Sequence, residues 1–214
     1  MADTGQLDRG FHYTDACLSC AHSYLLPAVH NILRAEARRR ADERMRIFDL
    51  GCGNGAVADV LKNAGYEVVG VDPSEEAIDF AAKAYPATQI FLGSAYDDLA
   101  GKFGTFPVVI SLEVVEHLYY PKKFAATLFS LVEPGGLAVV STPYNGYAKN
   151  LAIAALGGFD RHATALWDHG HIKFWSIKTL GELLRGAGFR NVEFSRVGRI
   201  PPLAKSMIAV ARRP

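Results

Sequence analysis

Cysteine is scarce in this sequence, with three residues among 214. So few cysteines, and an odd number of them, exclude a disulfide framework. Cys17 and Cys20 form a C-x-x-C pair beside His22, but a zinc site would need a second pair. The third cysteine, Cys52, lies inside a glycine-rich stretch. The pattern therefore indicates two small residues at the start of a helix rather than a metal site.

Net charge and long apolar runs are also lacking. The formal net charge is +1, so no overall field attracts nucleic acid or other acidic partners. The longest basic cluster, Arg38–Arg40, falls near the end of an expected helix, where it would complement the helix dipole and face solvent. No apolar stretch reaches the ~20 residues that span a bilayer, and the polar N-terminus does not resemble a signal peptide. We expect a cytoplasmic protein with no nucleic-acid partner and no integral membrane segment.

What the sequence does contain is a glycine-rich stretch after a short apolar run. Ile47 to Leu50 has the pattern of a buried strand, Gly51, Gly53 and Gly55 follow at a spacing of two, and Ala56 to Lys62 has helical character. Glycine is required where the backbone takes a positive φ or where a ligand lies against the main chain. This order of strand, glycine turn and helix is typical of the start of a nucleotide-binding βαβ unit.

Two aspartates indicate which kind of nucleotide is bound. Asp72 ends the next expected strand, Glu67–Val71, where a carboxylate can accept hydrogen bonds from both ribose hydroxyls. Asp49 lies two residues before the first glycine, where it would repel a pyrophosphate and attract a ligand that carries an ammonium and a sulfonium. The G-x-G-x-G spacing also differs from the dinucleotide pattern G-x-G-x-x-G. Phe48–Gly55 closely resembles the first motif of the class I S-adenosylmethionine-dependent methyltransferases.

This resemblance covers about residues 45–213 and implies both a fold and a cofactor. The fold is α/β: a doubly wound, Rossmann-like sheet of seven mostly parallel strands with a C-terminal antiparallel hairpin. The cofactor is S-adenosylmethionine. Many relatives have an acid at the position of Ser94 that binds the adenine amino group, so here Ser94, the Ala95 backbone or Tyr96 would supply that contact. The expected cofactor-binding residues are Asp49, Gly51, Cys52, Gly53, Gly55, Asp72, Pro73, Ser94, Ala95, Tyr96, Ser111 and Leu112.

We expect one domain, since 214 residues that are 50% hydrophobic suit a single core. The apolar spacing predicts one or two helices over 18–40, with a kink at Pro27. Tyr13 and Tyr24 would either cover the cofactor or pack on the sheet, and Glu133–Gly136 would form a tight turn before a strand. The expected parts are an N-terminal helical cap (1–44), a cofactor-binding core (45–141), an aromatic- and histidine-rich substrate lid (142–175, called the insert below) and a C-terminal helix with two strands (176–214).

Glu113, Glu116 and His117 follow the fourth expected strand, Phe106–Leu112, at the edge where α/β sheets bind ligands. They would share one face if the segment is helical. The E-x-x-E-H segment is similar to that of the ubiquinone-biosynthesis O-methyltransferases, where these residues are associated with magnesium, and His169–Ser176 also resembles that branch. Three interpretations stay open: Mg²⁺ on Glu113, Glu116 and His117; catalysis by Glu116 and His117, with His117 as general base; or a solvated helix start.

Together these features favour an enzyme that transfers a methyl group from S-adenosylmethionine to a small-molecule acceptor, at a hydroxyl oxygen. Two alternatives remain. One is a nicotinamide-dependent oxidoreductase, against which Asp49 and the glycine spacing argue. The other is a non-catalytic module that has kept the cofactor pocket, against which the presence of Glu116 and His117 argues.

Overall fold

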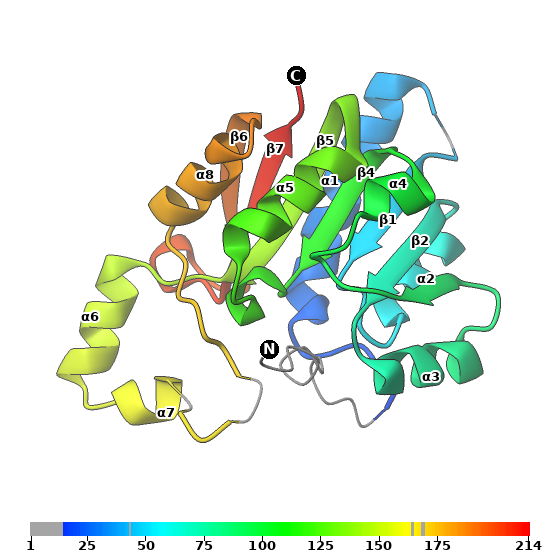
Figure 1. The fold of residues 1–214 in the computed structure, drawn as a ribbon. Helices are drawn as coiled ribbons and strands as arrows, with labels where there is room; N and C mark the ends of the chain where they lie inside the picture. Colours follow the sequence, from blue (N-terminus) through cyan, green and yellow to red (C-terminus); the bar gives the residue numbers. More distant parts are fainter. Residues whose placement is uncertain (1–14, 43, 164, 168–169) are drawn as a thin grey trace, which may run out of the picture.

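A seven-stranded sheet runs through the centre of the computed structural model, which describes residues 15–42, 44–163, 165–167 and 170–214 (Figure 1). The strand order is β3-β2-β1-β4-β5-β7-β6. The pairs among β1 to β5 are parallel, and β7 runs antiparallel to both β5 and β6. The predicted fold class is therefore confirmed. The strands are β1 (Arg46–Leu50), β2 (Glu67–Asp72), β3 (Gln89–Leu92), β4 (Phe106–Leu112), β5 (Val132–Pro143), β6 (Arg190–Val197) and β7 (Ser206–Arg212).

Helices cover both faces of this sheet and bury apolar residues against it. On one face, α1 and α2 contribute Leu25, Leu33 and Leu61 to a buried cluster; on the other, α5 and α8 contribute Phe124 and Leu184 (Figure 1). Among the described residues, no helix is both long and apolar enough to cross a membrane. The helices are α1 (His22–Arg40), α2 (Ala56–Asn63), α3 (Glu75–Ala84), α4 (Leu99–Phe103), α5 (Pro121–Leu131), α6 (Tyr147–Ala155), α7 (Phe159–Ala163) and α8 (Ile177–Gly186).

Several predicted boundaries were wrong. The N-terminal helix begins at His22 rather than at residue 18, and it continues through Pro27. Glu133–Gly136 is not a separate turn: β5 starts at Val132, which pairs with Phe106, and the register between the two strands shifts before Val108. The short helix α4 was not predicted. It begins after Asp98, whose side chain accepts a hydrogen bond from the backbone N–H of Gly101.

The insert lies beyond the carboxyl ends of the parallel strands, at the lower left of Figure 1. It leaves β5 at Pro143, forms α6 and α7, and returns toward α8. Leu151 on α6, Leu156 directly after it and Phe159 on α7 are exposed. The insert is therefore placed at the same edge of the sheet as the glycine loop.

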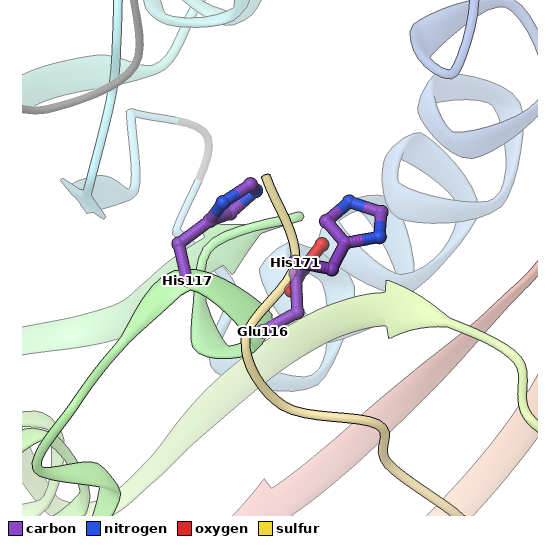
Figure 2. A group of neighbouring side chains, drawn as sticks. All are labelled: Glu116, His117 and His171. Carbon is purple, nitrogen blue, oxygen red and sulfur yellow. The ribbon is translucent and has the colours of Figure 1, made fainter. Parts of the chain in front are cut away.

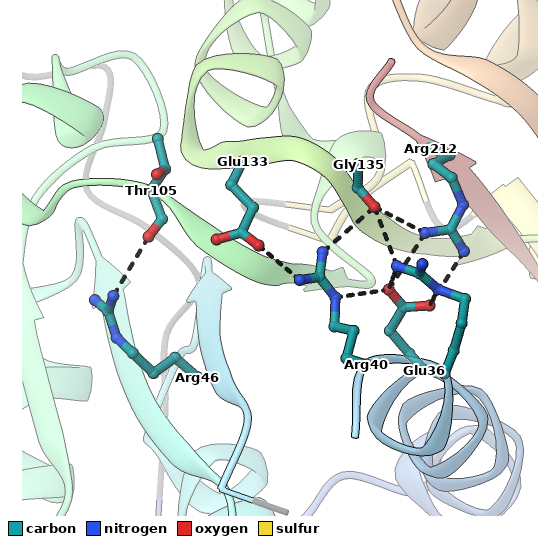
Figure 3. Close-up of polar contacts among 8 residues, drawn as sticks. Glu36, Arg40, Arg46, Thr105, Glu133, Gly135 and Arg212 are labelled. Atoms are coloured by element: carbon teal, nitrogen blue, oxygen red, sulfur yellow. Dashed lines mark hydrogen bonds and ion pairs between the residues drawn. The ribbon is translucent and has the colours of Figure 1, made fainter. Parts of the chain in front are cut away.

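At the opposite edge, the Glu36 carboxylate joins α1 to the strands (Figure 3). It accepts hydrogen bonds from Arg39, Arg40 and Arg212, and Arg40 also pairs with Glu133 at 2.7 Å. Glu36 is only 3% exposed. Burial opposes its ionisation, but the hydrogen bonds from the three arginines outweigh burial and lower its pKa to about 2. Within Arg38–Arg40, the expectation that the cluster faces solvent is thus wrong for Arg40, whose side chain is 19% exposed, whereas Arg38 and Arg39 are exposed.

Candidate functional site

The glycine loop connects β1 to α2 at the carboxyl edge of the sheet. Gly51, Gly53 and Gly55 all have positive φ, at 83°, 54° and 79°. A Cβ on Gly51 would approach the Val114 side chain to 2.6 Å, so any larger residue would push the loop away from β4. The loop therefore needs glycine for its conformation and for its close approach to the neighbouring segment.

Asp72, at the end of β2, holds this loop in place. Its Oδ2 accepts a hydrogen bond from the Gly53 N–H at 2.8 Å, and its Oδ1 accepts one from the Ser74 N–H at 2.9 Å. Both oxygens of this carboxylate therefore hold the backbone of the segments that follow β1 and β2. Asp72 and Pro73 both line the cavity described below.

Asp49 lies under the loop with its carboxyl group buried. It is 2% exposed, and its Oδ2 has no hydrogen-bond partner among the described residues. Burial, and then the charge of Asp72, raise the pKa of Asp49 to about 7. A cationic ligand group in the cavity that Asp49 lines would reverse this shift. This unpartnered oxygen fits a cofactor that carries an ammonium and a sulfonium.

Ser94, Ala95 and Tyr96 follow β3 and line the same cavity. The Ser94 N–H donates to Asp97 Oδ2 at 2.7 Å, and the Tyr96 N–H donates to Ser94 Oγ at 3.2 Å. Asp97 thus holds the conformation of the Ser94–Tyr96 loop. Ser94, the first residue of this loop, is at the position where many relatives have an acid. The loop is a candidate adenine-binding edge.

Ten of the twelve predicted cofactor residues line the cavity, and two do not. Ser111 is fully buried, and its hydroxyl donates to the Leu50 carbonyl at 2.8 Å, so it joins β4 to β1. Gly55 lies at the start of α2, behind the lining residues. The lining ones are Asp49, Gly51, Cys52, Gly53, Asp72, Pro73, Ser94, Ala95, Tyr96 and Leu112.

The segment before α1 crosses the glycine loop. Asn54 Nδ2 donates to the carbonyls of Asp15 and Cys17 at 2.9 and 3.0 Å, and the Tyr85 hydroxyl donates to the carbonyl of Ala16. Sequence reasoning missed both anchoring side chains, because Asn54 occupies a variable position of the glycine motif. Tyr24 lines the cavity, and its hydroxyl lies 3.2 Å from Ser206 Oγ. Tyr13, the other tyrosine expected to cover the cofactor or pack on the sheet, is outside the described residues.

The acidic segment after β4 is not the helical face that the sequence predicted. Only Val115–His117 form a single 3-10 turn, and Glu113 precedes that turn with a φ of 56°. Glu113 accepts hydrogen bonds from Ser141 Oγ at 2.8 Å and Ser206 Oγ at 3.2 Å. Burial raises its pKa, and these two bonds oppose the rise. Glu113 is therefore tied to the ends of β5 and β7.

Glu116 is the more deeply buried acid. It is 1% exposed, and neither of its carboxylate oxygens has a hydrogen-bond partner among the described residues. Burial, and then the charge of Glu113, raise its pKa well above the usual value. Burying a charged carboxylate without a hydrogen-bond partner costs free energy of folding. Such a group is therefore either protonated or bound to a ligand.

The returning end of the insert brings His171 to this turn (Figure 2). Glu116, His117 and His171 each offer a ligand atom, and the three atoms lie within 4.8 Å of one another. The imidazoles of His117 and His171 are 5.0 Å apart between centroids. Burial, and then the positive charges of His117 and His162, lower the pKa of His171 to about 4. No spacing pattern in the sequence pairs His171 with Glu116.

Mg²⁺ does not fit this group of donors. Mg²⁺ prefers oxygen ligands and retains water, whereas the group found in the described residues contains two imidazoles and one carboxylate and does not include Glu113. The C-x-x-C pair is likewise not part of any metal-binding group in that portion of the chain: Cys17 and Cys20 are free and exposed.

A cavity of about 1650 Å³ joins the glycine loop to the insert. Sites for one drug-sized ligand are usually ~300–1,000 Å³, so this cavity has room for a nucleoside cofactor and a second molecule. Asp49 and Asp72 line one end. His117, Lys149 and His162 line the other, together with the apolar residues Ala152 and Ile153 of α6.

This sheet order, with a glycine loop after β1, an acid at the tip of β2 and a two-part cavity, defines the class of S-adenosylmethionine-dependent methyltransferases. Residues 21–194 match the Methyltransferase domain family. The chain belongs to this family, which favours a methyltransferase over a nicotinamide-dependent oxidoreductase.

Within the family, the chain is similar to enzymes named ubiquinone biosynthesis O-methyltransferase. It is 30% identical over 203 residues to the one from Rhizobium johnstonii, covering 87% of this chain and 80% of that protein. It is 38% identical over 119 residues to the one from Caulobacter sp. strain K31, covering 54% of this chain and 47% of that protein. The chain thus spans about half the length of some of these relatives.

Solved structures share the fold at low identity. A SAM-dependent methyltransferase from Archaeoglobus fulgidus has a TM-score of 0.60 and 19% identity, covering 86% of this chain and 94% of that one. The magnesium protoporphyrin IX methyltransferase from Synechocystis PCC 6803, solved with bound SAH, has a TM-score of 0.61 and 21% identity. The match covers 94% of this chain and 91% of that one.

Proposed function

We propose that this methyltransferase transfers the methyl group to a hydroxyl oxygen of a small-molecule acceptor. The observation that carries the proposal is the likeness, at 30–38% identity, to relatives named for O-methylation. The carboxyl and imidazole groups at the β4 end of the cavity support it, because a weakly acidic hydroxyl needs help to lose its proton.

The cofactor end of the site positions the reacting methyl group. Bound S-adenosylmethionine supplies an electrophilic methyl on a sulfonium. Asp72 would accept hydrogen bonds from the ribose hydroxyls, the Ser94–Tyr96 loop would border the adenine, and Asp49 would face the cationic amino acid portion. Alignment of two reactants in a site of this kind can contribute up to ~7–11 kcal/mol.

His117 would take the proton that the acceptor hydroxyl loses on methylation. Its Nδ1 lies 3.2 Å from the Gly170 carbonyl, and the tautomer that donates there leaves the lone pair on Nε2. Glu116, with its raised pKa, can hold a proton beside it. We assign His117 as the base and Glu116 as its neighbouring acid.

The insert is proposed to act as the substrate lid, and residues before α1 as a cap over the cofactor. Residues of α6 and α7 line the acceptor end of the cavity, while the segment anchored by Asn54 borders the cofactor end. Closure at both ends would exclude water from the reacting groups.

A turnover assay tests the proposal. S-Adenosylhomocysteine release would be measured with matched phenol, catechol, aniline and thiophenol acceptors, and mass spectrometry would locate the added methyl. We expect methylation of oxygen and a loss of ~10²–10⁴ in rate for His117→Asn. Methylation of nitrogen or sulfur alone would contradict the hydroxyl assignment, and cofactor binding without turnover on any acceptor would favour a non-catalytic module.

A further inference from the structure

Positive charge gathers at the acceptor end of the cavity. Lys149 of α6, His162 of α7 and Arg199 of the segment between β6 and β7 all line the cavity there, and they are called the cationic group below. The transferred methyl group is already carried by a cation, so the reaction does not itself require positive charge on the acceptor side. We propose that the cationic group binds an anionic oxygen group, a carboxylate or a phosphate, that the methyl acceptor carries.

Lys149 is the centre of this group because its ammonium is held in place and partly buried. Its Nζ donates to the Tyr144 carbonyl at 2.9 Å and to the Ala204 carbonyl at 3.3 Å. Tyr144 follows β5 and Ala204 precedes β7, so the ammonium lies where α6 meets the loop between β6 and β7 (Figure 1). An ammonium has three donors. Two are used by the carbonyls, and the third is available to a ligand in the cavity.

The positive charges of the cationic group act on one another. Among the residues that the structure describes, neither Lys149 nor Arg199 forms an ion pair. Burial, and then the charge of Arg199, lower the pKa of Lys149. Burial, and then the charge of Lys149, lower the pKa of His162. An anion between these side chains would relieve the repulsion and favour their charged forms.

Acidic residues gather at the other end of the cavity. In the part of the chain that the structure describes, the acids that line it are Asp15, Asp49, Asp72 and Glu113. Asp15, Asp49 and Asp72 lie at or under the glycine loop. Glu113 accepts hydrogen bonds from two serine hydroxyls, and burial raises its pKa. The sign of the charge therefore changes along the cavity, from negative beside the expected cationic cofactor to positive at the acceptor end.

A purely structural role for Lys149 explains only part of this arrangement. An ammonium that bridges two carbonyls would join α6 to the loop between β6 and β7, but it would not require Arg199 and His162 beside it. Like charges that are brought together without an anion cost free energy. Lysine and arginine bind both carboxylates and phosphates, so the shared chemistry is an anionic oxygen group, and the experiment must separate the two.

The inference deepens the proposed function and rests on it for the identity of the ligand as the methyl acceptor. Binding of an anion can be measured without turnover. Loss of the proposed O-methylation would therefore leave the binding test intact. Absence of anion binding would leave O-methylation of a neutral acceptor intact, so the two failures are distinguishable.

Calorimetric titration of the full chain, with saturating S-adenosylhomocysteine in the cofactor end, tests the cationic group. The probes are hydroxyphenyl carboxylates with methylene spacers of increasing length, the primary amide of each, and the matching phosphate monoesters. The amide keeps the shape of the acid and removes its charge. We expect the best anion to bind ~10–100-fold more tightly than its amide, and this preference should decrease as salt is added. Whether the preferred anion is the carboxylate or the phosphate identifies the group that the acceptor carries.

Three variants assign the preference to these residues. Lys149→Met keeps the aliphatic stem and should lower the ratio of anion affinity to amide affinity by ~10-fold or more. Arg199→Gln, at an exposed position that leaves both carbonyl bonds intact, should lower the same ratio by a smaller factor. Lys173→Met is the control, because Lys173 belongs to the insert but does not line the cavity, and it should leave the ratio unchanged.

Binding of S-adenosylhomocysteine within a few-fold of wild type shows that each variant is folded. Equal affinity of wild type for the anions and their amides would overturn the proposal. So would an anion preference that survives in both Lys149→Met and Arg199→Gln, or an equal loss of preference in Lys173→Met.

Discussion

Asp72 and Gly53 are joined by a hydrogen bond of 2.8 Å from the Gly53 N–H to the Asp72 carboxylate. This bond links the tip of β2 to the glycine loop after β1, so the acid that is expected to bind the ribose also sets the conformation of the loop. The proposed ribose contact and the geometry of the glycine loop therefore depend on the same side chain.

Asp72→Ala should weaken S-adenosylmethionine binding by roughly 2–4 kcal/mol, because two hydrogen bonds to a carboxylate are lost at ~1.5–3 kcal/mol each and partly replaced by water. Asp72→Asn keeps one acceptor oxygen and should lose less. Calorimetry measures both, with Asp59→Ala as the control, since Asp59 on α2 bonds to Asn63 and Thr88 and does not line the cavity. Unchanged affinity in Asp72→Ala would place the ribose elsewhere.

Asp49 should make the ligand-free protein less stable as the pH rises from about 4 to 7. Its folded pKa of about 7 exceeds the unfolded value of ~3.9, so the folded state binds more protons in this range. The difference corresponds to roughly 4 kcal/mol. Asp49→Asn should raise the unfolding free energy at pH 8 by about 1–3 kcal/mol, because its buried amide retains a desolvation cost. Near pH 4, urea titrations should give the same unfolding free energy for Asp49→Asn and for wild type.

Asp49→Asn should also bind S-adenosylmethionine more weakly than wild type. A carboxylate facing a cationic ligand contributes roughly 1.5–3 kcal/mol, and ligand binding should release a proton from wild type at pH 6. Calorimetry in buffers of different ionisation enthalpy detects that proton. Tighter binding by Asp49→Asn would show that the carboxylate does not face the cationic portion.

Glu36→Ala should destabilise the fold by about 3–5 kcal/mol, since it leaves three arginines without their buried partner. The Glu36 pKa of about 2 lies below the unfolded value of ~4.3, so its contribution is present above pH 4.3 and disappears as the pH falls toward 2. The unfolding free energies of wild type and Glu36→Ala should therefore become equal near pH 2. Glu182→Ala, at an exposed position on α8, should change stability by less than ~0.5 kcal/mol.

Replacing Ala148–Asp160 by a short Gly-Ser linker should abolish turnover while keeping cofactor affinity within a few-fold. The deleted part contributes to the acceptor end of the cavity, and the Asp49–Asp72 end is built from other elements. Circular dichroism and calorimetry check the outcome. Loss of the folded state together with cofactor binding would show that the insert is structural.

The sequence predicted the parts of the fold that depend on local pattern. Ile47–Leu50 followed by three glycines, and Asp72 at the end of an apolar run, are short-range signals, and both lie where predicted. The Glu36 cluster and the approach of His171 to Glu116 depend on contacts between residues far apart in the chain, which no spacing rule contains. Glu113 illustrates a different failure: its positive φ breaks the periodicity from which a shared helical face with Glu116 was inferred.

Calorimetric titration with S-adenosylmethionine, S-adenosylhomocysteine and NAD tests the central claim most directly. The buried Asp49 oxygen that has no partner among the described residues, and the position of Asp72 at the tip of β2, predict one-to-one binding of the first two and none of NAD. Asp72→Ala should weaken both bound ligands together. Binding of NAD with no binding of S-adenosylmethionine or S-adenosylhomocysteine would contradict the account.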